Sequence, residues 1–190
     1  MKDLTYYLDA ASKNGPPRPG IILAIRMCLV ALTRLDIHDP VRPKRRLVVI
    51  VETDRCLPDA VQLVTGCRLG NRTLKLQDTG KMGAVFIDLQ NDRAIRLAAL
   101  ESANHEAAEL FPALERTDAL SRAYRVLADH ELFSEQRVRV LLAPEDLPGY
   151  HAPRVICARC GESIAFRREA QEDGRIFCCT CAASSYYEVL

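Results

Sequence analysis

The stretch VETDRCLPDAVQLVTGCRLG, residues 51–70, decides the predicted fold. It continues the apolar, β-branched run LVVIVET (47–53), which is typical of a buried strand. LPDAVQLVT (57–65) then has the composition of a helix, since Pro58 suits the first turn and Gly66 is a common stop signal. The stretch therefore predicts a buried strand that turns directly into a helix.

Cys56 closes this strand at the point where the helix begins. In open α/β arrangements ligands tend to bind at that end of a strand, and the amides of a following helix would stabilise a thiolate. Asp59 and Gln62 are spaced to share one helix face, which indicates a pocket beside Cys56, although a capping Asp59 with a solvent-facing Gln62 fits equally. Cys67 lies beyond a glycine, so we expect buried packing there rather than a redox pair with Cys56.

The segment QDTGKMG, residues 77–83, places Asp78 and Lys81 around a glycine turn. It lacks the glycine spacing of a phosphate-binding loop. Lys81 is therefore either a solvated surface charge or a cation that faces the pocket at Cys56, and the residues alone leave both open.

The rest of the chain mixes helical and extended segments. Helices are expected at 3–13, at 21–35 and across 102–133, where Pro112 interrupts the pattern. Strands are expected at 73–78, 83–89, 93–100 and 137–143. The chain changes character after the Pro-rich segment 144–153, so we predict a core domain of residues 1–147, a linker of residues 148–155 and a small domain of residues 156–190.

Two CxxC pairs, CARC at 157–160 and CCTC at 178–181, predict a zinc site in this small domain. The ligands that this spacing selects are Cys157, Cys160, Cys178 and Cys181, which leaves Cys179 spare. Four thiolates fill a tetrahedral shell and leave no position for water or substrate, so we expect one structural Zn²⁺. Nucleic-acid contact by the zinc finger and a redox switch remain as alternatives.

Composition narrows the class of protein. The net charge is +1 and the chain has no Trp, which speaks against nucleic acid as a partner. The N-terminus does not resemble a signal peptide, and the longest apolar run carries Arg26 and is too short to span a membrane. We therefore expect a cytoplasmic protein without a membrane partner, in which the eight cysteines do not form disulfides.

The segment from residue 51 to residue 86 resembles the family of the E-type accessory protein of formylmethanofuran dehydrogenase. That family shows an acid-Thr-x-x-Cys strand end, an Asp-Ala-hydrophobic-Gln helix, Thr-Gly-Cys-x-x-Gly and Asp-x-Gly-Lys-Met. The matching residues here are Glu52, Thr53, Cys56, Asp59, Ala60, Gln62, Thr65, Gly66, Cys67, Gly70, Asp78, Gly80, Lys81 and Met82. The resemblance implies an α+β core, with a mixed or antiparallel sheet packed with helices, and a treble-clef-like zinc finger. It also implies a homodimer and association with a molybdenum or tungsten enzyme of one-carbon metabolism.

One segment departs from the family. Its members begin the first core helix with His-Gly-His-x-Cys-Pro-Gly, where this chain has Asn14, Pro16 and Arg18 in place of the two histidines and the cysteine. We therefore expect the core to bind no metal, or to bind it weakly through Cys56, and Arg18 to offer a cation to an anionic ligand. The predicted core pocket consists of Arg18, Cys56, Asp59, Gln62, Thr65, Cys67 and Lys81.

These features predict a zinc-binding, non-catalytic accessory or ligand-binding protein. Two alternatives remain. The first is a stand-alone enzyme with Cys56 as the catalytic nucleophile, which would need a base that no motif supplies. The second is a regulatory or nucleic-acid-binding protein that works through the zinc finger.

Overall fold

The computed structural model describes residues 2–188, and the side chain of Asn14 lies outside the described parts. The chain divides into two compact units, Met1–Leu141 and Leu142–Leu190, here called the core unit and the C-terminal unit. This division falls slightly earlier in the chain than the predicted end of the core domain at residue 147. The helices of the described part are all too short or too polar to cross a membrane.

The core unit is built on one five-stranded sheet. Its strands are β1 (Leu47–Val51), β2 (Leu74–Leu76), β3 (Gly83–Asp88), β4 (Arg93–Ala99) and β5 (Phe133–Val138). Their order is β2-β1-β3-β4-β5, in which β1 and β2 are parallel and the other neighbours are antiparallel. The sheet is therefore mixed, and with the helices of the same unit it confirms the predicted α+β class.

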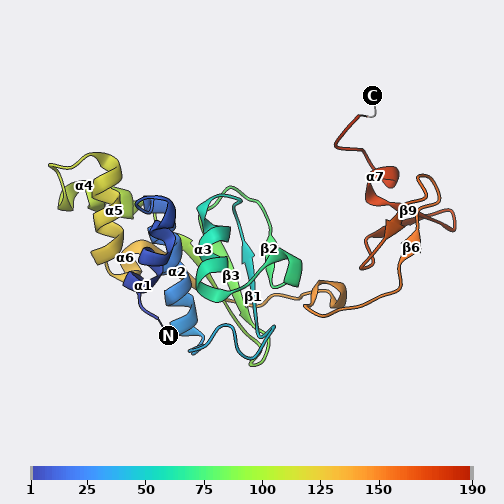
Figure 1. Ribbon diagram of the computed structural model, residues 1–190, viewed down its shortest axis with the longest axis horizontal. Helices are drawn as coiled ribbons and strands as arrows, with labels where there is room; N and C mark the ends of the chain where they lie inside the picture. Colours follow the sequence, from blue (N-terminus) through green and yellow to red (C-terminus); the bar gives the residue numbers. More distant parts are fainter. Residues whose placement is uncertain (1, 189–190) are drawn as a thin grey trace. The chain divides into compact units, whose positions relative to one another are not determined.

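Helices of the core unit pack together beside this sheet (Figure 1). The α-helices are α1 (Leu4–Ala11), α2 (Pro19–Arg34), α3 (Cys56–Thr65), α4 (Ser102–Leu110), α5 (Arg116–Val126) and α6 (Asp129–Leu132). Short 3₁₀ turns are η1 (Ser12–Asn14) and η2 (Leu69–Asn71). The predicted helices at 3–13, 21–35 and 57–65 are thus present with small shifts in their ends.

Helix α2 is the centre of the core because it packs against α1, α3, α5 and β4. Pro19 fits its first turn, where no backbone donor is lost. Arg26, the charge inside its apolar run, donates to the carbonyls of Tyr124 and Leu127 at 3.0 Å and to Asp129 at 2.7 Å. A cation there satisfies the carbonyls at the C-terminus of α5, which explains an arginine in an otherwise apolar helix.

The two faces of the sheet differ in what they carry. Val49, Val51 and Phe86 belong to the buried cluster that includes α2 and α3. The opposite face carries a row of cross-strand neighbours, in which Ile50 pairs with Val85, Val85 with Arg96 and Arg96 with Gln136. Successive residues of a strand point to opposite faces, so this second, more polar face is a direct consequence of the register.

The predicted strand at 137–143 is wrong, because β5 runs from Phe133 to Val138. Phe133 is buried and pairs with Ala99, which sets the register of β5 against β4. Val138 pairs with Ala94, one residue from the end of β4, so the residues after Val138 have almost no partner strand to continue on. The apolar alternation of 137–143 suggested a strand, but the neighbouring strand decides where pairing stops.

The C-terminal unit is made of short elements. These are η3 (Pro144–Asp146), β6 (Val155–Ile156), β7 (Ser163–Ile164), β8 (Glu169–Glu172), β9 (Arg175–Cys178) and α7 (Cys179–Ala182). Strand β6 pairs with β7, and β8 with β9. A knuckle, a hairpin and a short helix follow one another, as a treble-clef-like zinc finger requires. Its buried cluster contains only Cys157, Ile164 and Phe177, which is too small a core to stabilise the unit alone.

Candidate functional site

Four cysteines of the C-terminal unit form the candidate metal centre. Cys157 and Cys160 lie in the turn between β6 and β7, Cys178 ends β9, and Cys181 lies in α7. Their sulfur atoms all lie within 4.8 Å of one another, and Cys160 Sγ is 3.9 Å from Cys178 Sγ. Around a tetrahedral Zn²⁺ with Zn–S bonds of about 2.3 Å, sulfurs are separated by about 3.8 Å. The donor set therefore fits the group that the spacing predicts.

Backbone N–H groups hold these sulfurs in place. The N–H of Cys178 donates to Cys157 Sγ at 3.3 Å, and the N–H of Cys181 donates to Cys178 Sγ at 3.4 Å. Hydrogen bonds from the N–H groups of Cys160 and Cys178 lower the pKa of Cys157 to about 6, whereas Cys178 raises the pKa of Cys181 to about 12. Four thiolates so close together need a cation between them, and a divalent metal ion supplies it.

Cys179 takes no part in this cluster. Its Sγ donates to the carbonyl of Arg168 at 3.1 Å, and it is exposed. The structure thus brings together the four cysteines that the CxxC spacing selects and leaves the fifth as a separate thiol.

In the core unit, Cys56 begins α3 and lies against the first turn of α2. A Cβ atom on Gly20 would stand 3.0 Å from Cys56 Sγ, which is closer than ordinary van der Waals contact. The segment that departs from the family is therefore next to Cys56. Pro16 and Arg18 are exposed and carry no metal-binding atom. Among the described side chains, Cys56 belongs to no group of three or more His, Cys, Asp or Glu residues that could hold an ion.

We expect Gly20→Ala to be neutral or destabilising in the natural chain but stabilising when Cys56 is replaced by Ala. Alanine is favoured over glycine inside a helix by roughly 0.5–1 kcal/mol, and the short approach to Cys56 Sγ opposes this gain. Urea unfolding of the natural chain, both single variants and the double variant measures the coupling. An equal effect of Gly20→Ala in both backgrounds would show that the contact is relaxed at no cost.

The remaining residues of the predicted pocket are held differently. Asp59 and Gln62 are exposed on α3, and Gln62 Nε2 donates to the carbonyl of Pro58 at 3.4 Å. Arg18 is the exposed residue before α2 and makes no capping hydrogen bond with its side chain. Thr65 is buried, and its Oγ1 donates to the carbonyl of Val61 at 2.6 Å. A pocket shared by these residues stays a prediction.

Cys67 is a buried thiol beyond the far end of α3. Its Sγ donates to the carbonyl of Leu47 at 3.5 Å, and burial raises its pKa. Burial also raises the pKa of Cys28 on α2, so both thiols are protonated and unreactive at neutral pH. The ten residues of α3 put roughly 15 Å between its two ends, which separates Cys67 from Cys56 as expected.

Lys81 lines a different hollow, of about 400 Å³, on the polar face of the sheet. Its neighbours there include Glu52 and Arg96, which form a two-pronged ion pair at 2.6 and 2.7 Å. Hydrogen bonds from Arg96 lower the pKa of Glu52 in spite of its burial. Sequence reasoning missed Arg96 and Gln136 in this hollow, because only the pairing of β4 with β3 and β5 brings them beside Glu52.

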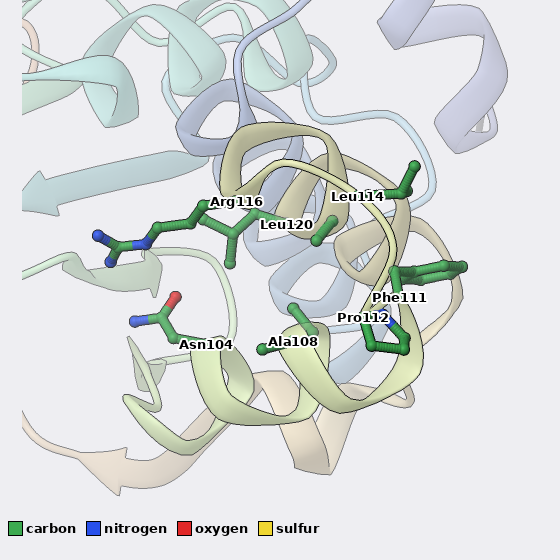
Figure 2. A pocket seen from close by; sticks show the side chains of 9 residues that line it. Asn104, Ala108, Phe111, Pro112, Leu114, Arg116 and Leu120 are labelled. Carbon is green, nitrogen blue, oxygen red and sulfur yellow. The ribbon is translucent and has the colours of Figure 1, made fainter.

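A second hollow, of about 320 Å³, lies between α4 and α5 (Figure 2). Asn104 and Arg116 lie at one end and Phe111 at the other, with Leu120 between them. Asn104 Oδ1 already accepts a hydrogen bond of 2.7 Å from Tyr124 Oη, so this largely apolar hollow offers few free polar groups.

A third hollow, of about 600 Å³, lies among α1, the loop after α2 and α3. Its polar groups are paired with one another. Lys2 Nζ stands 3.7 Å above the ring of Tyr6, and His38 Nε2 is 3.0 Å from Asp36 Oδ1. The hollow at Lys81 differs from the other two in the polar groups that face it.

Known proteins share both the sequence and the fold. The family described as "FmdE, Molybdenum formylmethanofuran dehydrogenase operon" matches residues 15–147. A curated protein of Archaeoglobus fulgidus, named "Probable S-adenosyl-L-methionine-binding protein", is 28% identical over 203 aligned residues, which cover 96% of this chain and 54% of that protein. The chain therefore spans about half the length of this relative.

A solved structure supports the fold. It is an FmdE-like protein of the tungsten formylmethanofuran dehydrogenase type from Syntrophus aciditrophicus, with a TM-score of 0.64 and 24% identity. The alignment covers 99% of this chain and 96% of that chain, so the fold is shared over both units. Because the family match extends over residues 15–147, well over half of the sequence, this chain belongs to the FmdE family.

Proposed function

We propose that this protein binds one structural Zn²⁺ and serves as a non-catalytic accessory protein of a molybdenum or tungsten enzyme. The observation that carries the zinc site is the cluster of four sulfurs within 4.8 Å of one another. Bound there, zinc would supply folding energy to the C-terminal unit, because four cysteine ligands leave no open position for a substrate. The accessory role is supported by the family, whose description names a molybdenum enzyme operon.

Native mass spectrometry tests the zinc site. We expect one Zn²⁺ on the full chain and none on a chain ending at Leu141, which retains the whole core unit. A stoichiometric metal on the shorter chain would contradict both the position of the site and the expected loss of the core metal donors.

The accessory role is tested in the cells that make the protein. Affinity purification of the tagged chain is expected to enrich molybdenum or tungsten in the eluate, measured by elemental mass spectrometry. Purification of a homodimer alone, without either metal, would argue for a protein that works apart from such an enzyme. Light scattering of the purified chain gives the oligomeric state, which we infer to be a homodimer.

The alternative of a Cys56 nucleophile has less support. A cysteine nucleophile needs a base beside it, and the histidines of the core unit lie in other elements. His38 lies in the loop after α2 and is paired with Asp36, His105 lies in α4, and His130 lies in α6. Labelling with iodoacetamide across pH distinguishes the two, since an activated Cys56 would react well below the pH at which an ordinary thiol does.

A further inference from the structure

The hollow of about 400 Å³ at Lys81 has the size of a small-molecule site. It opens on the sheet face away from the buried cluster of α2 and α3. Its apolar floor is the cross-strand pair of Ile50 and Val85. Its polar walls come from the ion pair, from β5 and from the segment between β2 and β3.

The ion pair of Glu52 and Arg96 is fixed on all sides. Glu52 is 9% exposed, and both its oxygens accept from Arg96. Gly83 makes room for it, because a Cβ atom there would stand 3.0 Å from Glu52 Oε2. Arg96 Nη1 also donates to Gln136 Oε1 at 3.2 Å, which leaves the amide NH₂ of Gln136 to donate elsewhere.

The segment between β2 and β3 is held over this pair by its backbone. The N–H of Gln77 donates to the carbonyl of Val51 at 2.9 Å, and those of Thr79 and Lys81 donate to the carbonyl of Glu52 at 3.0 and 3.3 Å. These bonds fix the positions from which the side chains of Gln77, Thr79 and Lys81 line the hollow. The walls are therefore built by the fold rather than by chance contacts of surface side chains.

The charges of the hollow do not balance. Arg96 is matched by Glu52, whereas no described residue forms a hydrogen bond or ion pair with the amine of Lys81. One positive charge is thus left over, together with hydrogen-bond donors on Thr79 and Gln136. A ligand that complements this surface carries one negative charge and has a hydrocarbon part for the floor.

We propose that this hollow binds a small organic carboxylate, with its oxygens on Lys81, Thr79 and Gln136 and its hydrocarbon part against Ile50 and Val85. A phosphate fits less well, because it carries nearly two negative charges, has no apolar part and would face the carboxylate of Glu52. The site goes beyond the proposed zinc and accessory functions. It lies wholly in the core unit, so its test does not depend on the metal centre.

Butyrate is the probe for this site, titrated into the full-length, zinc-loaded, ¹⁵N-labelled chain. We expect saturable NMR shifts of the amides of Thr79, Lys81 and Gln136, with a Kd on the order of 1 mM. Lys81→Met should weaken binding at least about tenfold, since it removes the charge and keeps the length of the side chain. The matched control is Lys13→Met, which removes an exposed lysine on η1 and should leave the Kd unchanged.

Two comparison probes make the outcome decisive. Inorganic phosphate and butylammonium should both bind far more weakly than butyrate, because one lacks the hydrocarbon part and the other has the wrong charge. Shifts that never saturate, an unchanged Kd in Lys81→Met, or phosphate that binds as tightly as butyrate would each overturn the proposal. The NMR spectrum of Lys81→Met itself shows whether the variant is folded.

Discussion

Replacing Cys157 by Ser is expected to abolish metal binding and to unfold the C-terminal unit while the sheet of the core unit stays intact. Cys157 is 2% exposed and is both a ligand and a member of the three-residue buried cluster. Zinc binding to comparable small fingers is worth about 10–16 kcal/mol at neutral pH, far more than such a cluster can supply. Loss of one thiolate should therefore remove the folded state of the unit.

Elemental analysis and NMR measure the two parts of this prediction. The zinc content should fall from one per chain to near zero, and amide signals of β6 to α7 should collapse to the shifts of an unfolded chain. Signals of β1, β3 and β4 should not move. A chelator added to the natural chain should reproduce the same spectrum, because the metal and the ligand are removed from the same site.

Cys179→Ser is the matched control. It makes the same chemical change next to a ligand, at a thiol that bonds only to the carbonyl of Arg168. The variant should keep its zinc and its fold. Loss of zinc in Cys179→Ser together with full retention in Cys178→Ser would mean that Cys179 is the ligand in place of Cys178.

The sequence predicted best where the relevant residues are close together along the chain. The CxxC pairs place two ligands each within one turn, and the run from Leu47 to Gly66 encodes a strand, a helix and a stop within twenty residues. Gly66 has φ of 72° and its N–H donates to the carbonyl of Gln62, as a helix-ending glycine does. Local signals of this kind need no knowledge of the sheet.

Features that depend on strand register could not be predicted. Glu52 and Arg96 are 44 residues apart and meet only because β1, β3 and β4 pair in the observed order. The same pairing ends β5 at Val138 and puts Lys81 in a hollow with Gln136. In each case the partner strand, which a single sequence does not identify, decides the position of the side chain.

The second large effect is expected in the core unit, where Arg96→Met should lower the free energy of unfolding by about 3 kcal/mol at pH 7. The side chains of Arg96 and Glu52 are only 23% and 12% exposed, and removing the arginine leaves a carboxylate without its counter-charge. Glu52→Gln should cost less, because the more exposed guanidinium of Arg96 can regain water and keeps its bond to Gln136.

The cost of Arg96→Met should also depend on pH. In the natural chain Arg96 lowers the pKa of Glu52 below that of an unfolded glutamate. The pair therefore stabilises the fold fully above the unfolded pKa, near 4.3, and this stabilisation is lost as the pH falls through the lower, folded value. The difference between the natural chain and Arg96→Met should be largest at neutral pH and should shrink below about pH 4.

Urea unfolding followed by far-UV circular dichroism measures both effects, with zinc held at saturation so that the C-terminal unit is unchanged. Arg93→Met is the control, since Arg93 lies on the same strand, is exposed, and bonds only to the carbonyl of Arg34. It should cost less than about 1 kcal/mol and show no such pH dependence. If Arg96→Met cost no more than Arg93→Met, or cost the same at pH 3 as at pH 7, the pair would be a surface contact and its carboxylate would not be buried enough to order the hollow beside Lys81.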